Sequence, residues 1–273
     1  CDCRTRSRPF CSDLIFMIPP TMPDDSNAPD DAHEIDPSKI KDLTGGHIFR
    51  RFDGELDHLH HLVLEMGGLA LSQLRVAMAA FKGQDTVLAR EVLKRDETLD
   101  RMEVSADEEI FKLLVRQSPV GSDLRVVFSV TKSVSDIERI GDEAVRIAGL
   151  VSQIFSCETL LDSTNRALLG DINRIGDKAL LTLESAVELF DTWDEDSALS
   201  VIAGNRDMGD EFTAEVERLM HHIVNHAHNI GFAVSMVLMV KSLERITHHA
   251  QSLVEYAFFE MKGLDIRGNP RSA

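Results

Sequence analysis

Apolar residues recur at alternating steps of three and four along this chain, and this spacing restricts the possible folds more than any other feature. In the first such series the positions are Phe49, Phe52, Leu56, Leu59, Val63, Met66 and Ala70. The spacing returns later at Leu168, Ile172, Ile175, Ala179, Thr182, Ala186 and Leu189. Because an α-helix makes about 3.6 residues per turn, each series lies on one face and predicts a long helix packed along that face.

The composition favours the same fold class. Hydrophobic residues make up 43% of the 273 residues but aromatic residues only 5%, so the core is built from Leu, Val, Ile, Ala and Met. Aliphatic cores suit helices, whereas sheets favour aromatic and β-branched residues. The chain also has only 8 prolines and 16 glycines, too few to form the turns of a many-stranded β protein. We therefore expect an all-α fold.

Charge and cysteine content exclude several classes of partner. The formal net charge of −17 repels nucleic acids and anionic lipids, which leaves cations, basic protein surfaces and metal ions as partners.

Cys157 is the single cysteine after residue 11, so we expect no disulfide framework and a reducing, cytoplasmic location. No uninterrupted apolar run approaches the roughly 18 residues of a membrane span, so no membrane insertion is expected.

Glycine, proline and capping residues divide the body into six predicted helices. The breaks fall at Gly83–Asp85, Pro119–Ser122, Ser156–Thr164, Trp193–Asp196 and His228–Gly231, and the last helix ends near Gly263. Long helices with short connections favour antiparallel neighbours and bundle packing. Outside the body, residues 1–46 are rich in proline and polar residues, which predicts a disordered tail or sequence upstream of a true start at Met17 or Met22. We expect residues 264–273 to form a C-terminal tail.

The two halves of the body repeat each other. Asp136-Ile-Glu-Arg-Ile140 in the third helix matches Ser242-Leu-Glu-Arg-Ile246 in the sixth, and the two glutamates are 106 residues apart (244 − 138). That separation is close to half of the body. We therefore predict two tandem three-helix bundles related by internal duplication, at residues 47–155 and 164–263.

One acidic pair lies at the edge of a packed helix face. Glu138 and Asp142 are i and i+4, so they share a row on the third helix. The same row holds Val134, Gly141 and Val145. Like charges repel, and they repel more strongly when they are partly desolvated. A cation near this pair would offset the repulsion, and Gly141 leaves room for an approaching helix or ion.

The second helix supplies a counterpart, because Asp96 and Asp100 are again i and i+4. If the second and third helices pack antiparallel, four carboxylates converge. Carboxylate oxygens without thiolates suit Fe, Mn or Mg, and an added histidine extends the choice to Zn. An ordinary solvated acidic surface remains the alternative, since Arg139 and Arg146 lie close in sequence to Glu138 and Asp142.

Several short motifs follow one another along the body: Glu65-Met-Gly-Gly-Leu69 in the first helix, Arg116-Gln-Ser-Pro119 with Ser122-Asp-Leu-Arg125 at the second turn, and Glu138-Arg-Ile-Gly-Asp142. In sequence and in order these motifs resemble the PhoU family. The similarity extends from about His47 to Gly263. It implies two three-helix bundles that bind metal clusters at paired Glu/Asp-x-x-x-Asp motifs, and we also expect a homodimer.

The resemblance further implies a phosphate-signalling adaptor and not an enzyme. Such an adaptor links the ATPase subunit of the phosphate ABC transporter to a sensor histidine kinase. It represses the phosphate-starvation response and phosphate uptake when phosphate is plentiful.

Carried over residue by residue, the resemblance assigns metal-binding positions that differ between the halves. In the first half they are Asp96, Asp100, Glu138 and Asp142. In the second half Glu244 and His248 occupy the motif, with histidine in place of aspartate, while Asn205 and Gly209 stand where acids are expected. We therefore expect the second site to be absent or altered to include His248.

Two other functions remain as alternatives. A carboxylate-bridged metalloenzyme would use Glu-x-x-His at i, i+3, but Glu244 and His248 are i, i+4. The sequence also lacks a nucleophile elbow, a P-loop and a dinucleotide-binding glycine motif, which favours a non-catalytic protein. The second alternative is a structural adaptor that binds no metal.

Overall fold

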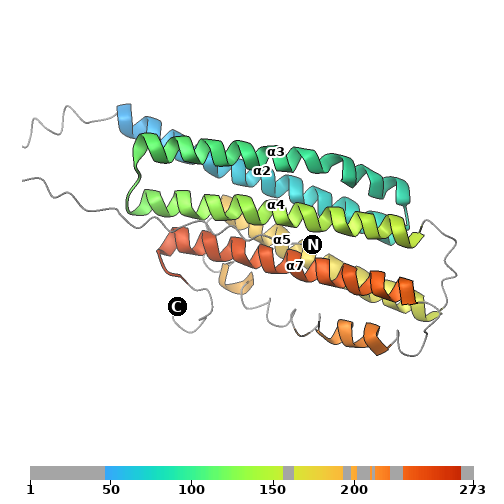
Figure 1. Cartoon of the computed structure of the whole chain (residues 1–273). Helices are drawn as coiled ribbons and strands as arrows, with labels where there is room; N and C mark the ends of the chain where they lie inside the picture. The colour runs from blue at the N-terminus through green and yellow to red at the C-terminus, as the bar shows by residue number, and fades with distance from the viewer. Residues whose placement is uncertain are drawn as a thin grey trace, which may run out of the picture. The chain divides into compact units, whose positions relative to one another are not determined.

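Five long helices dominate the computed structural model of this chain (Figure 1). They are α2 (His47–Gly83), α3 (Thr86–Gln117), α4 (Ser122–Phe155), α5 (Ser163–Thr192) and α7 (Ile230–Lys262). The structure describes residues 47–155, 163–192, 198–201, 210, 213–221 and 230–265, without the side chains of 47–53, 95–96 and 163–165. The predictions for residues 1–46, for the linker and turn after α4 and α5, for much of the fifth helix and for residues 266–273 fall outside this description.

The helix ends follow the predicted capping chemistry. Asp85 caps α3, because its side chain accepts hydrogen bonds from the N–H groups of Val87 at 2.8 Å and Leu88 at 3.0 Å. At the other end of α3, Ser118 adopts a left-handed conformation with φ 44°. Gly121, with φ 62°, completes the turn into α4. This turn reverses the chain and sets α3 against α4.

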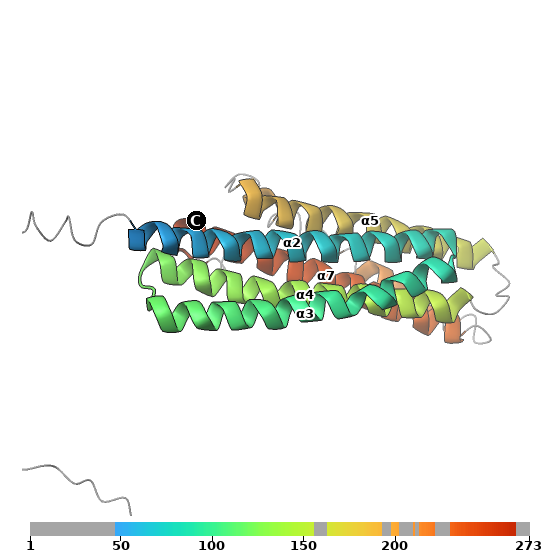
Figure 2. The same cartoon turned by 90° about the horizontal axis from the view of Figure 1, so that it is seen from above.

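The helices of both halves share one core. Within the first half, α2, α3 and α4 pack against one another, and in the second half α5 packs against α7. The halves are joined where α4 contacts α7 and where α2 contacts α5, and Figures 1 and 2 show these helices side by side. The buried aliphatic residues of both halves form one continuous cluster. The predicted fold class, all-α with tandem, duplicated three-helix bundles, is confirmed.

The duplication is visible in the contact between α2 and α5. Gly67 of α2 faces Val187 of α5, and Gly176 of α5 faces Met78 of α2. The glycines are 109 residues apart (176 − 67), and so are the facing residues (187 − 78). The same glycine-against-side-chain contact therefore occurs twice, once from each repeat. Gly67 thereby allows a close approach of α2 and α5.

Most of α2 is apolar enough to resemble a membrane-crossing helix. The segment Gly54–Gly83 passes a test of length and composition for such a helix, and 50% of its apolar window is buried inside the bundle. Core helices of soluble proteins pass the same test. Because α2 contacts α3, α4 and α5, its apolar residues form part of the shared core.

Adjacent glycines in α2 provide a matched test of this packing. A Cβ added at Gly67 would lie 2.9 Å from Val187 Cγ2, whereas a Cβ at Gly68 would meet nothing within 4 Å. Because overpacking costs about 1–3 kcal/mol, Gly67→Leu should lower the free energy of unfolding by that amount. Gly68→Leu should leave it unchanged or raise it by less than about 1 kcal/mol, since leucine favours helix more than glycine does. Chemical denaturation of the two variants measures both values, and equal effects would contradict the close approach.

Candidate metal centre

Three carboxylates meet in the groove between α3 and α4. Asp100 of α3 and Glu138 and Asp142 of α4 each offer an oxygen, and these oxygens all lie within 4.8 Å of one another. Glu138 is half-buried, while Asp100 and Asp142 are exposed. The i, i+4 spacing of the α4 pair places both on the face that α3 covers, as the sequence predicted.

The groove disfavours the ionised form of its acids. Burial, together with the carboxylates of Asp142, Glu103 and Asp100, raises the pKa of Glu138 to about 7. Burial and the nearby carboxylates of Asp100 and Glu143 also raise the pKa of Asp142. Desolvation and mutual repulsion act in the same direction here. An added cation would therefore be bound most strongly where these charges are least compensated.

A fourth acid, Glu103, belongs to the same environment and was not identified from the sequence. Burial and the carboxylates of Asp107 and Asp100 raise its pKa, and its carboxylate accepts a hydrogen bond from Ser135 of α4 at 3.5 Å. The signal was present, because Glu103 follows Asp100 by three residues and so continues the acidic row. The sequence prediction included only the i, i+4 pair, Asp96 and Asp100.

The arginines next to the cluster are engaged elsewhere. Arg139 pairs with Asp136 at 3.1 Å, and Arg146 lies 3.6 Å from Glu143. Among the described residues, no Lys or Arg forms an ion pair with Asp100, Glu138 or Asp142. From the sequence alone, these arginines could equally have formed ion pairs with Glu138 and Asp142. In the structure they pair with two other carboxylates of α4.

This donor set fits a hard cation. It consists of carboxylate oxygens from two helices that the turn at Gly121 holds together. Fe, Mn and Mg prefer such oxygen ligands, and no cysteine or histidine belongs to the described group. The residues present are therefore compatible with the expected metal ion.

The remaining predicted ligands are not part of this group. Asp96 lies in α3, one turn before Asp100, but its side chain is outside the description. In the second half, Glu244 pairs with Lys241 on its own helix, and His248 is exposed. Asn205 and Gly209 fall outside the described residues. The role of Glu244 and His248 in binding metal thus stays a prediction.

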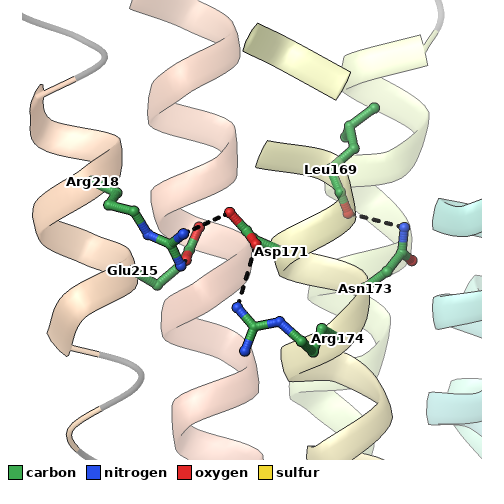
Figure 3. Close-up of polar contacts among 6 residues, drawn as sticks. All are labelled: Leu169, Asp171, Asn173, Arg174, Glu215 and Arg218. Atoms are coloured by element: carbon green, nitrogen blue, oxygen red, sulfur yellow. Dashed lines mark hydrogen bonds and ion pairs between the residues drawn. The ribbon is translucent and has the colours of Figure 1, made fainter. Parts of the chain in front are cut away.

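The second half contains a mixed-charge network where its helices meet. Asp171 of α5 accepts a hydrogen bond from Arg218 at 2.9 Å and also pairs with Arg174 at 3.3 Å. Arg218 pairs in addition with Glu215, whose side chain is fully buried. Figure 3 shows Asp171 between the two arginines. Here arginines of the chain pair with the acids, although burial still raises the pKa of Glu215.

A cavity at one end of the first half is a weaker candidate site. It has a volume of about 290 Å³ and lies between α2 and α3. Its charged residues pair with one another, since His58 lies 2.9 Å from Glu109 and Arg116 lies 3.3 Å from Glu55. These pairs satisfy the charges that a ligand would otherwise meet.

The fold and the groove together define a class of tandem three-helix-bundle proteins with an acidic site between the second and third helices. The sequence pattern of the PhoU domain matches this chain twice, at residues 63–151 and 172–257. The chain therefore belongs to the PhoU family. The sequence resemblance to that family is confirmed.

Individual relatives agree with this assignment. The phosphate-specific transport system accessory protein PhoU homolog of Pseudomonas putida is 34% identical over 221 residues, which cover 81% of this chain and 84% of the relative. The crystal structure of PhoU from Pseudomonas aeruginosa matches with a TM-score of 0.73 and 30% identity, covering 78% of this chain and 100% of that one. A PhoU structure from Streptococcus pneumoniae, 23% identical with a TM-score of 0.70, supports the fold.

The raised pKa of Glu138 predicts how pH affects metal-free protein. A carboxyl whose pKa is about 7 when folded and 4.5 ordinarily stabilises the fold fully below pH 4.5 and loses that contribution as the pH rises through 7. Glu138→Gln removes this loss. As the pH rises between these values, the free energy of unfolding of the variant should therefore increase relative to that of wild type.

Chemical denaturation in a chelator, at stepped pH, measures the difference. Glu91→Gln, which alters an exposed acid of α3 outside the cluster, serves as the control and should track wild type. A difference between Glu138→Gln and wild type that stays constant with pH would contradict the arrangement of the groove.

Proposed function

We propose that this protein is a cytoplasmic phosphate-signalling adaptor whose first half binds a hard metal cation. It links the ATPase subunit of a phosphate ABC transporter to a sensor histidine kinase and represses the phosphate-starvation response when phosphate is plentiful. Membership of the PhoU family is the observation that carries this proposal. Relatives named as accessory proteins of the phosphate-specific transport system support the association with a transporter.

The acidic groove supports the metal-binding part of the proposal. Three carboxylates within 4.8 Å, with no paired arginine or lysine among the described residues, create a local excess of negative charge. A bound cation offsets that charge and stabilises the folded state by linkage. Fe, Mn and Mg are the candidates for this all-oxygen group, and Zn joins them where His248 contributes.

The same features favour a binding role over catalysis. An acidic chain with a net charge of −17 suits basic protein surfaces as partners and disfavours nucleic acid. The candidate centre presents carboxylates alone among the described residues, whereas a carboxylate-bridged oxidase combines them with histidine at i, i+3. A homodimer that presents two such adaptors to its partners belongs to the same proposal.

The regulatory role predicts the effect of deleting the gene. If the protein represses the phosphate-starvation response, deletion should raise expression of phosphate-starvation genes in phosphate-rich medium. Transcript levels in rich and poor medium measure this. The wild-type gene supplied in trans, which should restore repression, is the control. Unchanged expression in both media would contradict the adaptor role.

The asymmetry between the halves predicts where the metal binds. The double change Glu138→Gln with Asp142→Asn should remove most of the metal from purified protein, because it removes two of the three clustered ligands. His248→Ala should remove little, and mainly above the ordinary histidine pKa of about 6.5, because a protonated imidazole is not a ligand. Elemental analysis of untagged protein measures both. Equal losses would refute the asymmetry, and no loss in either variant would refute the metal centre.

A further inference from the structure

A fully buried amide lies beside the acidic groove. Gln73 of α2 has no exposed surface, and neither its Oε1 nor its Nε2 has a hydrogen-bond partner in the described structure. A buried polar group without a partner costs about 1–3 kcal/mol. Native interiors seldom contain such groups unless water, an ion or a functional role explains them. Gln73 therefore requires a partner that the described side chains and backbone do not supply.

The position of Gln73 connects it to the candidate metal centre. A Cβ added at Gly141 would lie 3.1 Å from Gln73 Oε1, and it would also touch the side chain of Leu99. Gly141 immediately precedes Asp142 on α4, and Leu99 immediately precedes Asp100 on α3. The amide therefore lies next to Gly141, one residue along α4 from Asp142, and the neighbouring Leu99 is one residue along α3 from Asp100. Gly141 leaves the space that Leu99 and the amide occupy.

The internal repeat provides an independent comparison. The repeat offset of 109 residues pairs Gln73 with Thr182 (182 − 73), and the offset of 106 pairs Gly141 with Thr247 (247 − 141). Both threonines hydrogen-bond to carbonyls of their own helices, Thr182 to Lys178 at 3.1 Å and Thr247 to Leu243 at 3.0 Å. The second half, whose motif has histidine instead of aspartate, therefore lacks both the amide and the glycine.

We propose that Gln73 is the buried positioning residue of the cation site, which rests on the proposed function of the acidic groove. When a hydrated cation occupies the groove, the Gln73 Oε1 accepts a hydrogen bond from a cation-bound water and Nε2 donates to a ligand carboxylate. Hard cations retain water when they bind to carboxylates. Such outer contacts orient ligands, and their loss typically costs about 10–100-fold in metal affinity. The amide thus gains its partners only in the loaded protein.

The test compares metal affinity with metal-free stability in the full chain. Gln73→Leu and Gln73→Met keep a buried side chain of similar volume but remove the amide, and Thr182→Val is the matched change in the other half. Mn²⁺ is titrated into chelator-treated protein and followed by calorimetry, and thermal unfolding is recorded without metal. Both Gln73 variants should bind Mn²⁺ about tenfold or more weakly and yet unfold at a higher temperature without metal. Thr182→Val should bind Mn²⁺ as wild type does.

The opposite directions of the two readouts separate a positioning role from a packing role. If both Gln73 variants lose affinity and metal-free stability together, Gln73 is a packing residue and the proposal is overturned. Unchanged Mn²⁺ affinity in either folded variant also overturns it. Wild-type protein that binds no Mn²⁺ refutes the cation site itself, so this failure is distinguishable from failure of the Gln73 assignment alone.

Discussion

The packing of α4 against α7 is the contact on which the rest of the structure depends, because it joins the two repeats and buries two acids of α4. Across this contact Glu143 Oε1 accepts a hydrogen bond from Arg245 at 2.9 Å. The repeat pairs Arg245 with Arg139 and Glu143 with His249, so the mirrored contact would bring two potentially cationic groups together. Asp136 resolves this conflict by contacting both Arg139 and His249 at 3.1 Å. The arginine of each pair is more than half exposed, so solvent screens the attraction, and the main effect of these pairs is to give the buried Asp136 and Glu143 partners at the contact between the repeats.

The same contact determines which charges remain in the groove. Arg139 and Arg146 form their ion pairs with Asp136 and Glu143, and they lower the pKa of Glu138 and of Asp142 less than burial and the neighbouring carboxylates raise it. One face of α4 therefore holds the repeats together, and the neighbouring face carries acids that have no ion pair among the described residues. The acidic groove and the contact with α7 therefore lie on the same 34-residue helix.

The sequence predicted those features that arise from local rules. The bounds of α4, Ser122–Phe155, and the cap at Asp85 follow from turn and capping residues, and the i, i+4 acids identified the groove. Features that depend on the partner helix were not predictable. Sequence cannot tell that Gly67 faces Val187 while its neighbour Gly68 faces open space. Likewise, a single glutamine in an apolar series looks like a surface residue, and burial of Gln73 becomes evident only when α3 and α4 are placed around it.

The two repeats neutralise their acids in different ways, and this difference locates any dependence on metal. In the second half one arginine of the chain, Arg218, pairs with both the buried Glu215 and Asp171 (Figure 3). In the first half the clustered acids of α3 and α4 form no ion pair among the described residues, and Arg139 and Arg146 lower the pKa of Glu138 and of Asp142 less than burial and the neighbouring acids raise it. Folding must then either protonate Glu138, whose raised pKa makes this feasible near neutrality, or recruit a cation from solution. The duplicated bundle therefore treats its acids differently in its two halves: Arg218 pairs with Glu215 and Asp171 in the second, whereas Asp100, Glu138 and Asp142 in the first form no ion pair among the described residues.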